Sequence, residues 1–379
     1  MKRLVSICDW LPPDFGAVGQ YAEIAARMAA EAGAEVTLVG LTSTAGQITE
    51  EALGKGSIRT VRVKARPYAR ANFRQRALWT AATNWRLLRR AWPHARRADE
   101  ILFTGSPPFF LHWMVPANLL LRKKLTYRIT DFHPECLIAE LGRTPLWLRL
   151  FLYWTLFLRR RIDRFEVLGE DQRRRLLAIG IPAERIVLRR DESPVAIDAA
   201  TEPLQLPEAL AGKVVLLYSG NFGVAHDDAT FIAGYAGHHI SGGGQVVLWL
   251  NAAGAKADRV EAALRERSLP VHRTRPVPIA ELSRLLVTPH AHLITLRDEF
   301  VGYVLPSKVY GCIASGRRVL FVGSAASDVH LLCSERLPAG GYRRVAVGDA
   351  AGVARALDEL AATAAAGDAE RAGADSALR

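Results

Sequence analysis

The sequence predicts an α/β chain of two domains, each a doubly wound parallel sheet with helices between its strands. A chain of 379 residues is long for one domain and comfortable for two. Patterns typical of buried strands alternate with helical patterns, and this alternation starts near residue 3 and again near residue 213. Residues 196–212 are rich in Ala, Pro and Glu and show no period, so we interpret them as a linker.

The predicted boundaries follow from this alternation. We expect a first domain over 1–195, the linker over 196–212 and a second domain over 213–366. The last residues, 367–379, are small and polar and are expected to form a disordered tail.

The first domain opens with a βαβ pattern. An apolar run over 3–8 predicts a strand, and because Asp9 ends it early, the basic N-terminus fits this strand better than a signal peptide. A glycine-bearing loop leads to a helix over 20–32, which Gly33 caps, and then to a strand over 35–41. This is the opening of a doubly wound sheet.

The same signals continue along the chain. In the first domain we expect strands over 58–63, 100–104, 126–130, 164–168 and 185–188, and helices near 72–92 and over 171–178. In the second we expect strands over 213–219 and 245–251 and helices over 228–237 and 352–365.

The stretch over 293–323 carries the strongest local signal. Two apolar runs predict strands, and between them lie a loop and a short helix over 307–315 that begins after Pro306 and ends at Gly316. The helix start would present backbone N–H groups, the Ser307 hydroxyl and the Lys308 ammonium at one point, which attracts phosphate. The alternative is an ordinary βαβ unit with a solvated Lys308.

Three titratable residues follow the predicted strand over 126–130. Asp131, His133 and Glu135 alternate with Phe132 and Pro134, and alternation in an extended segment puts them on one side. The carboxyl end of such a strand is where α/β sheets keep their chemistry. The alternative is that His133 is a hydrogen-bonded loop histidine.

Charge and cysteine content limit the possible classes of protein. The four cysteines are scattered without a CxxC pair, which argues against a zinc site or a disulfide framework. The net charge is +12, and residues 55–190 hold roughly three basic residues for each acidic one. Because these basic residues are interleaved with Trp and Leu, the composition suits an anionic membrane surface.

The run over 146–158 is the most apolar in the chain. A spanning helix needs about 20 apolar residues, so this run does not span a membrane. It is either a buried core helix or an interfacial one, anchored by Trp147, Phe151 and Trp154 and followed by three arginines over 159–161.

The segment VLPSKVYGCIASGRRVLFVG resembles the donor-binding segment of family 4 retaining glycosyltransferases of the GT-B fold, in the lipopolysaccharide and capsule branch. PPDFGAVG, LGEDQRRRLLAIGIPAERIVL and YSGN resemble further segments of that family. The resemblance implies two Rossmann-like doubly wound domains facing an interdomain cleft. It also implies transfer of a sugar, with retention, from a nucleotide-sugar donor to a saccharide acceptor that is lipid-linked.

The resemblance also implies site residues. A DxHxE-like stretch faces the donor sugar, which gives Asp131, His133 and Glu135 as catalytic candidates. No nucleophile is assigned, and because basic side chains and helix starts stabilise the leaving diphosphate, no metal or other cofactor is required. The implied donor-binding residues are Gly16, Ala17, Gly220, Asn221, Val277, Arg297, Glu299, Pro306, Ser307, Lys308, Tyr310 and Gly311.

Three positions depart from the family pattern. Ala17 replaces a glycine of the first loop, and residues 224–226, Val-Ala-His, lack the basic residue that the family often has after its second glycine turn. Gly311 stands where the second glutamate of the family's paired glutamates falls, and Asp298 or Glu299 stands in for the first.

These departures keep open an inactive GT-B binding or scaffold protein, and the basic first domain keeps open a nucleic-acid binder. Against the latter, the arginines form no clean basic stripe and no nucleic-acid module is recognisable. We therefore expect a glycosyltransferase of cell-surface polysaccharide biosynthesis, cytoplasmic and peripherally attached to the inner face of the cell membrane, with no nucleic acid as partner.

Overall fold

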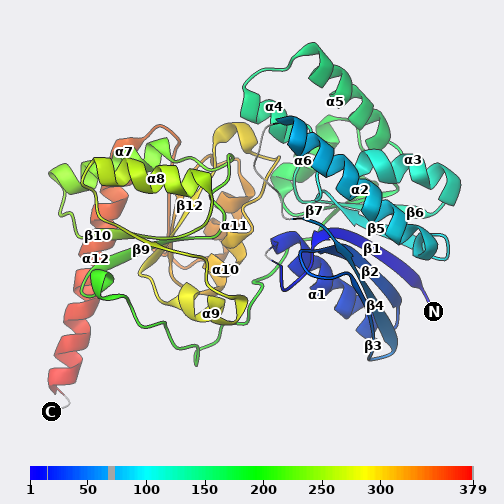
Figure 1. The fold of residues 1–379 in the computed structure, drawn as a ribbon. Helices are drawn as coiled ribbons and strands as arrows, with labels where there is room; N and C mark the ends of the chain where they lie inside the picture. The colour runs from blue at the N-terminus through cyan, green and yellow to red at the C-terminus, as the bar shows by residue number, and fades with distance from the viewer. Residues whose placement is uncertain (15, 67–72, 378–379) are drawn as a thin grey trace. The chain divides into compact units, whose positions relative to one another are not determined.

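The computed structural model describes residues 1–14, 16–66 and 73–377 (Figure 1). The chain divides into two compact units. The first unit comprises residues 1–191 together with 302–305, and the second comprises 192–301 and 306–379.

The first unit holds a sheet of eight strands in the order β3-β4-β2-β1-β5-β6-β7-β8. All pairs are parallel except β3 with β4, which form an antiparallel hairpin at one edge. The strands are β1 (Arg3–Trp10), β2 (Glu35–Thr42), β3 (Gln47–Leu53), β4 (Gly56–Lys64), β5 (Glu100–Thr104), β6 (Lys124–Ile129), β7 (Arg164–Val167) and β8 (Ile186–Leu188).

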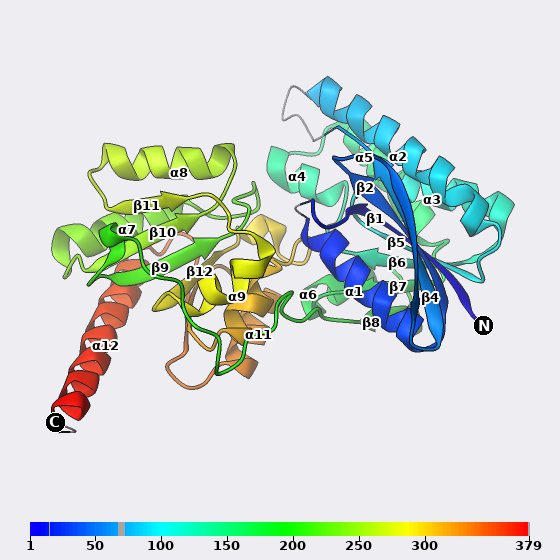
Figure 2. The same cartoon turned by 60° about the horizontal axis from the view of Figure 1, so that its bottom comes forward.

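Helices connect these strands and cover both faces of the sheet, as Figure 2 shows for α1 and α2 on opposite sides. They are α1 (Ala17–Glu31), α2 (Phe73–Ala95), α3 (Leu111–Leu121), α4 (Glu135–Leu141), α5 (Leu146–Arg159) and α6 (Glu170–Ala178), with a 3₁₀ turn η1 (Ala183–Arg185).

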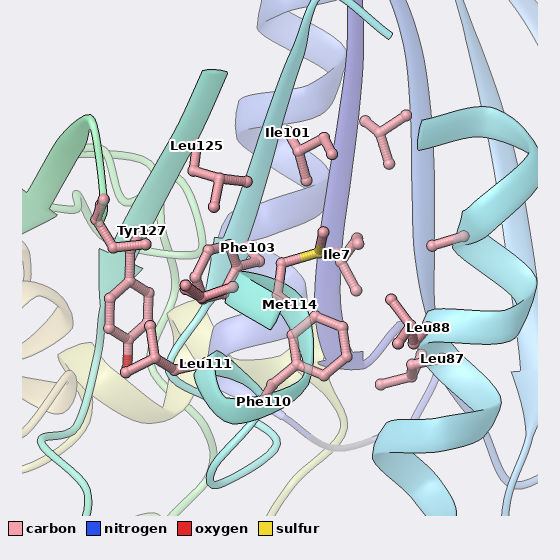
Figure 3. Close-up of a cluster of buried hydrophobic side chains, with 14 of the residues drawn as sticks. Ile7, Leu87, Leu88, Ile101, Phe103, Phe110, Leu111, Met114, Leu125 and Tyr127 are labelled. Carbon is pink, nitrogen blue, oxygen red and sulfur yellow. The ribbon is translucent and has the colours of Figure 1, made fainter. Parts of the chain in front are cut away.

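Because both faces are covered, neighbouring residues of one strand enter different cores. Val5 and Ile7 of β1 join the cluster under α2 and α3, whereas Cys8 joins the cluster under α1. In Figure 3, aromatic side chains from β5 and from the start of α3 fill the first of these cores, and the rings of Phe103 and Tyr127 stack at 4.7 Å.

The second unit holds a sheet of six parallel strands in the order β11-β10-β9-β12-β13-β14. The strands are β9 (Val214–Ser219), β10 (Val246–Asn251), β11 (Val271–Thr274), β12 (Ala291–Thr295), β13 (Arg318–Val322) and β14 (Tyr342–Val345). Its helices are α7 (Ala229–Ser241), α8 (Ala255–Glu266), α9 (Ile279–Val287), α10 (Lys308–Ala314), α11 (Asp328–Arg336) and α12 (Ala350–Ala377), with 3₁₀ turns η2 (Glu208–Leu210) and η3 (Asp298–Phe300).

The prediction of two doubly wound α/β domains is confirmed. The boundaries differ from those expected: residues 192–195 belong to the second unit and residues 302–305 to the first. Residues 196–212 are no free linker, because Leu210 is buried and Leu204 and Leu206 pack against the same apolar cluster of the second unit. In place of a disordered tail from 367, α12 continues to Ala377, and the last two residues of that predicted tail lie outside the described residues.

Candidate functional site

In the second unit the strand order reverses between β9 and β12, and ligands bind doubly wound sheets outside the carboxyl ends of the strands at such a point. Gly220 follows β9 with a φ of +105°, a left-handed conformation that favours glycine. Across this turn the hydroxyl of Tyr218 donates to the carbonyl of Asn221 at 3.0 Å. The predicted residues Gly220 and Asn221 therefore lie at the switch point.

Lys308 lies against the same turn. Its Nζ is 3.2 Å from the centroid of the Tyr218 ring, and a methyl group placed on Gly220 would be 4.0 Å from its Cε. The Nζ is buried and has no hydrogen-bond partner among the described residues. Burial lowers the pKa of Lys308 to about 7. A buried ammonium without a partner is costly, so an anionic ligand at this point would stabilise it.

The helix that carries Lys308 contributes less than its sequence predicted. Ser307 is its N-cap residue, but the Ser307 side chain makes no capping hydrogen bond, and α10 spans only seven residues. Gly316 ends the turn with the predicted left-handed φ, +65°. So short a helix has a weak dipole, and the side chain of Lys308 is therefore the main feature that favours phosphate binding here.

Three further predicted residues lie next to Lys308 in the sequence, and all three are buried. They are Pro306, Tyr310 and Gly311. A methyl group placed on Gly311 would approach Leu286 of α9 to 3.0 Å. A glutamate at position 311 would therefore have to displace Leu286, so the departure from the family pattern agrees with the packing of α9 against α10.

The loop over 223–228 is held against the end of β12. The backbone N–H of Arg297 donates to the Ala225 carbonyl at 2.8 Å. The Nδ1–H of His226 donates to the Thr295 carbonyl at 2.6 Å. Burial, together with the charge of Lys308, lowers the pKa of His226 to about 3, so its imidazole is neutral at pH 7.

A basic residue from another element contacts this loop. Lys256, in the first turn of α8, donates to the His226 carbonyl at 2.5 Å and pairs with Asp228 at 3.0 Å. Sequence reasoning missed it. The available signal was its place a few residues after the carboxyl end of β10, the strand next to β9.

Arg297 and Glu299 lie beyond the end of β12 and pair with each other. The Nε of Arg297 is 3.4 Å from the Glu299 carboxylate, and both side chains are partly exposed. The guanidinium also lies 5.5 Å from the centroid of the Phe300 ring. Arg297 is thus near the switch point, but part of its charge is already matched.

The strand ends next to the predicted base-binding loop are tied together. Asn251 donates to the Thr274 hydroxyl at 2.9 Å and to the Arg275 carbonyl at 2.6 Å, and it accepts from Ser219 at 3.3 Å. Val277, two residues beyond Arg275, packs partly buried against the apolar cluster of Leu217 and Trp249. This network fixes where the loop leaves the sheet.

In the first unit the glycine loop meets the end of β1 closely. A methyl group placed on Gly19 would lie 1.8 Å from the Trp10 carbonyl oxygen, so only glycine fits there. Gly16 is the N-cap residue of α1, and Ala17 is its first residue. Residue 15 of the predicted loop lies outside the described residues.

Two half-buried carboxyl groups flank the end of β5. Asp9 accepts from the Ser106 hydroxyl at 2.6 Å, and its other oxygen has no partner among the described residues. Burial raises the pKa of Asp9 to about 6, although the Ser106 hydrogen bond opposes this. Burial, with the charge of Asp9 added, raises the pKa of Asp131 to about 6 as well. Asp131 therefore shares its surroundings with Asp9, which the sequence did not single out.

The predicted alternation of Asp131, His133 and Glu135 is wrong. Glu135 begins α4, so the chain turns after His133, and the Glu135 carboxylate pairs with buried Arg159 through both oxygens, one at 2.9 Å. Arg159 also donates to the His133 carbonyl at 3.1 Å. Glu135 therefore holds the loop in place, and Arg159 belongs to the interior of the first unit.

His133 is half-buried beside aromatic side chains. Its ring lies 5.4 Å from that of Phe109, and burial lowers its pKa to about 4. His112 lies nearby; its ring stacks on Phe151 at 4.6 Å, and its Nε2 is 2.9 Å from the Thr155 hydroxyl. Phe151, predicted as a membrane anchor, thus packs against this cluster, and His112 was missed because its neighbours come from α5.

The segment over 302–305 packs into the first unit beside the 131–135 loop. The Tyr303 carbonyl accepts from the Phe132 N–H at 3.0 Å, and Asp131 and Val304 form an antiparallel bridge. The guanidinium of Arg175 lies 4.5 Å from the centroid of the Tyr303 ring. The segment over 302–305, which belongs to the first unit, therefore contacts the loop that carries His133.

Residues 16–190 match a family model described as a glycosyl transferase 4-like domain. No curated protein matches the chain by sequence. Among solved structures, a sucrose-phosphate synthase from Thermosynechococcus elongatus aligns with a TM-score of 0.66 at 14% identity, over 96% of this chain and 90% of that one.

Two further solved structures align at similar levels. WaaG, a glycosyltransferase involved in lipopolysaccharide biosynthesis, gives a TM-score of 0.61 at 14% identity over 95% of this chain and 90% of that one. Anabaena HepE, solved with UDP-glucose, aligns with a TM-score of 0.61 at 12% identity, over 94% of this chain and 89% of that one. The family match covers slightly less than half of this chain, and the whole chain shares the GT-B fold of these solved structures.

Proposed function

We propose that the protein transfers a sugar, with retention, from a nucleotide-diphosphate sugar to a lipid-linked saccharide, in cell-surface polysaccharide biosynthesis. The observation that carries the proposal is the unpartnered, buried Nζ of Lys308 at the switch point of the second sheet. The glycosyl transferase 4-like domain and the fold shared with WaaG and with donor-bound HepE support it.

In this proposal the donor diphosphate binds against the turn at Gly220. The absence of a side chain there leaves room for phosphate oxygens, and Lys308 meets them as a protonated ammonium. Lys256 and Arg297 lie nearby at α8 and at the end of β12, but each already pairs with a carboxylate, so in this proposal Lys308 is the main cation for the leaving diphosphate and no metal is required. Asn251 and Val277 fix the loop that borders the base.

The sugar is handled by His133 in this proposal. With a pKa of about 4, the imidazole is neutral at pH 7 and offers a hydrogen bond in place of a full charge. Such a contact accelerates the reaction only if it strengthens as charge develops. Glu135 and Arg159 act through the loop backbone, since both are occupied with each other.

We also propose that α5 attaches the protein to the anionic inner face of the cell membrane. No helix in the described part of the chain is long and apolar enough to cross a membrane. However, α5 exposes a stripe of large side chains at helical spacing, with the exposed arginines Arg149, Arg160 and Arg161 beside it. The stripe comprises Leu146, Trp147, Leu150, Tyr153, Trp154 and Phe157.

An anionic bilayer suits this surface because its headgroups attract the arginines and its acyl region takes up the apolar side chains. Each basic residue near such a leaflet contributes about 1 kcal/mol and is screened by salt, whereas burial of the apolar stripe is not. The protein should float with phosphatidylglycerol vesicles at low salt and stay partly bound at high salt. Leu146→Ser/Leu150→Ser should lose the salt-resistant part, and Ile240→Ser, an exposed apolar residue of the second unit, should not.

The donor proposal is tested by thermal shift with a panel of uridine, guanosine, adenosine and thymidine diphosphate sugars. At least one should raise the melting temperature of the wild type, because a ligand that binds the folded state alone stabilises it. That donor should also be consumed in the presence of membrane lipid extract. Binding without turnover would favour an inactive GT-B binding protein, and binding of an oligonucleotide alone would favour a nucleic-acid binder.

A further inference from the structure

A basic groove in the first unit is lined by residues of α2 and of the β3–β4 hairpin. It has a volume of about 740 Å³, within the range of small-ligand sites. Five basic residues line it, three of them on α2 and two on β4, and no acidic residue does among the described residues. The five are Arg62, Lys64, Arg86, Arg89 and Arg90.

The arrangement follows from the sequence of α2. Arg86, Arg89 and Arg90 are exposed at spacings of three and four residues, so they share one face of the helix. Between them, Leu87 and Leu88 point into the core and fix how α2 is turned on the sheet. The buried residues Val61 and Val63 of β4 anchor the opposite wall in the same core.

Most of the groove's positive charge has no ion-pair partner in the described part of the chain, although Arg62 lies close enough to Asp14 to lower the pKa of that carboxyl. Across the residues that the structure describes, none of the five cations forms an ion pair, whereas Arg59 on the same strand pairs with Glu50 at 2.7 Å. His94, at the end of the groove, has a pKa lowered by burial and by Arg59 and Arg97, so it adds no charge near pH 7. Unmatched like charges repel each other, and a polyanion would relieve that repulsion.

The groove is joined to the glycine loop. The guanidinium of Arg62 donates to the Pro12 carbonyl at 3.1 Å, and Pro12 precedes the loop that leads to Gly16 and Ala17. Arg62, a residue of the groove wall, therefore also contacts the edge of the sheet that carries the candidate site of this unit.

We propose that this groove binds the phosphate groups of the acceptor, a saccharide carried on a diphosphate. The inference rests on the proposed function for the saccharide part of the ligand. Arginine favours phosphate because its planar guanidinium donates two parallel hydrogen bonds to one phosphate group. A compact groove with three arginines on one helix face suits two adjacent phosphates better than an extended nucleic acid, which needs a continuous basic track.

The test compares the wild type with Arg86→Gln/Arg90→Gln by calorimetric titration of inorganic pyrophosphate. Both arginines are exposed and glutamine is a good helix former, so the variant should fold. The wild type should bind pyrophosphate, and the variant should bind it at least about tenfold more weakly, since two charge-assisted contacts are removed. The matched control, Arg96→Gln/Arg97→Gln, removes the same charge next to the groove and should bind like the wild type.

Two more arms separate this inference from the donor proposal. Lys308→Met should keep the groove's pyrophosphate binding, and the groove variant should keep donor binding. If Lys308→Met abolishes pyrophosphate binding and the groove variant does not, the groove inference is overturned while the donor proposal stands. If no nucleotide-sugar binds but pyrophosphate binding depends on Arg86 and Arg90, the groove stands and the donor proposal fails.

The source of the phosphates is tested with phosphatidylglycerol vesicles and with a single-stranded oligonucleotide. Vesicle binding should be unchanged in Arg86→Gln/Arg90→Gln. Loss of vesicle binding in this variant, without pyrophosphate binding in the wild type, would make the groove a lipid contact and overturn the inference. So would oligonucleotide binding that depends on the two arginines while pyrophosphate does not bind.

Discussion

Each unit contains a buried cation near its candidate site, and the two cations differ in whether the protein provides hydrogen-bond partners for them. In the first unit, Arg159 is held by both oxygens of Glu135 and by the His133 carbonyl. In the second, the Nζ of Lys308 lies over an aromatic ring with no hydrogen-bond partner among the described residues. Although burial opposes the charge of Arg159, Glu135 raises its pKa, whereas burial lowers that of Lys308 to about 7.

The comparison teaches how to tell a structural charge from one that awaits a ligand. Removing a cation from water costs several kcal/mol, and a folded protein recovers this cost only through partners. Arg159 has those partners within its own unit, so its role is to hold the loop over 132–135. Lys308 has only the face of the Tyr218 ring and no hydrogen-bond partner among the described residues, so an anion that binds there would recover most of its cost.

The largest expected effect is on stability, from breaking the satisfied pair. Arg159→Met should lower the free energy of unfolding of the first unit by about 3 to 5 kcal/mol, because Glu135 is left buried and unpaired. Urea unfolding monitored by circular dichroism measures this change. Arg159→Met/Glu135→Met should recover most of the loss, and a double variant as unstable as the single one would contradict this interpretation.

Next in size is the effect of Lys308→Met on the donor. Loss of the charge-assisted contact to the diphosphate should weaken donor binding by about a hundredfold. Calorimetric titration of the donor identified by thermal shift measures it. Arg355→Met, an exposed basic residue of α12, serves as a control that should bind normally. Equal donor affinity in wild type and Lys308→Met would remove Lys308 from the site.

A smaller effect is expected at His133. His133→Ala should lower kcat by roughly tenfold to a hundredfold and leave KM for the donor nearly unchanged, because a contact made chiefly in the transition state is lost. His133→Gln, which keeps a hydrogen-bond donor, should recover part of the rate. A rise in KM with normal kcat would mean that His133 only binds substrate.

The smallest expected effect is an increase in stability, whereas most substitutions of buried residues lower stability. Without ligand, Lys308→Met should raise the melting temperature by about 2 to 4 °C at pH 6 to 7, because a buried unpaired charge is replaced by an apolar side chain. The gain should shrink between pH 7 and 10. There the folded protein already holds Lys308 neutral while the unfolded chain still binds the proton, so wild-type stability rises with pH. Differential scanning fluorimetry across this range would detect the trend, and a destabilised variant at pH 6 would show that the ammonium has an internal partner.

How far the sequence could predict this arrangement depended on the range of the contacts. The two sheets and the position of Lys308 were predictable, because a strand, a loop and a Pro-Ser-Lys turn are local signals. The pairing of Arg159 with Glu135 was not, since α5 must fold back before the two can meet, and an arginine after an apolar helix looks like a solvated one. Lys256 likewise approaches the loop over 223–228 only through the parallel alignment of β9 and β10.

The packing of 302–305 beside the 131–135 loop shows the same limit. No local pattern marks a segment of the second half of the chain as part of the first unit. Gly311 is a further case, because the close approach of Leu286 that favours glycine at this position can be seen only once α9 and α10 are packed together. What was missed in each case is a contact between residues distant in sequence.

The central claim is that the donor diphosphate provides the partner that Lys308 lacks, and proton uptake tests it most directly. Nucleotide-diphosphate sugars keep a constant charge between pH 6 and 9, so a proton taken up on binding must come to the protein. With a pKa of about 7 in the free protein, Lys308 is mostly neutral at pH 8 and should become protonated against the diphosphate. Donor titrations at pH 8 in two buffers of different ionisation enthalpy should therefore show uptake approaching one proton in the wild type and almost none in Lys308→Met. Equal uptake in both proteins, or none in either while the donor binds, would contradict the account.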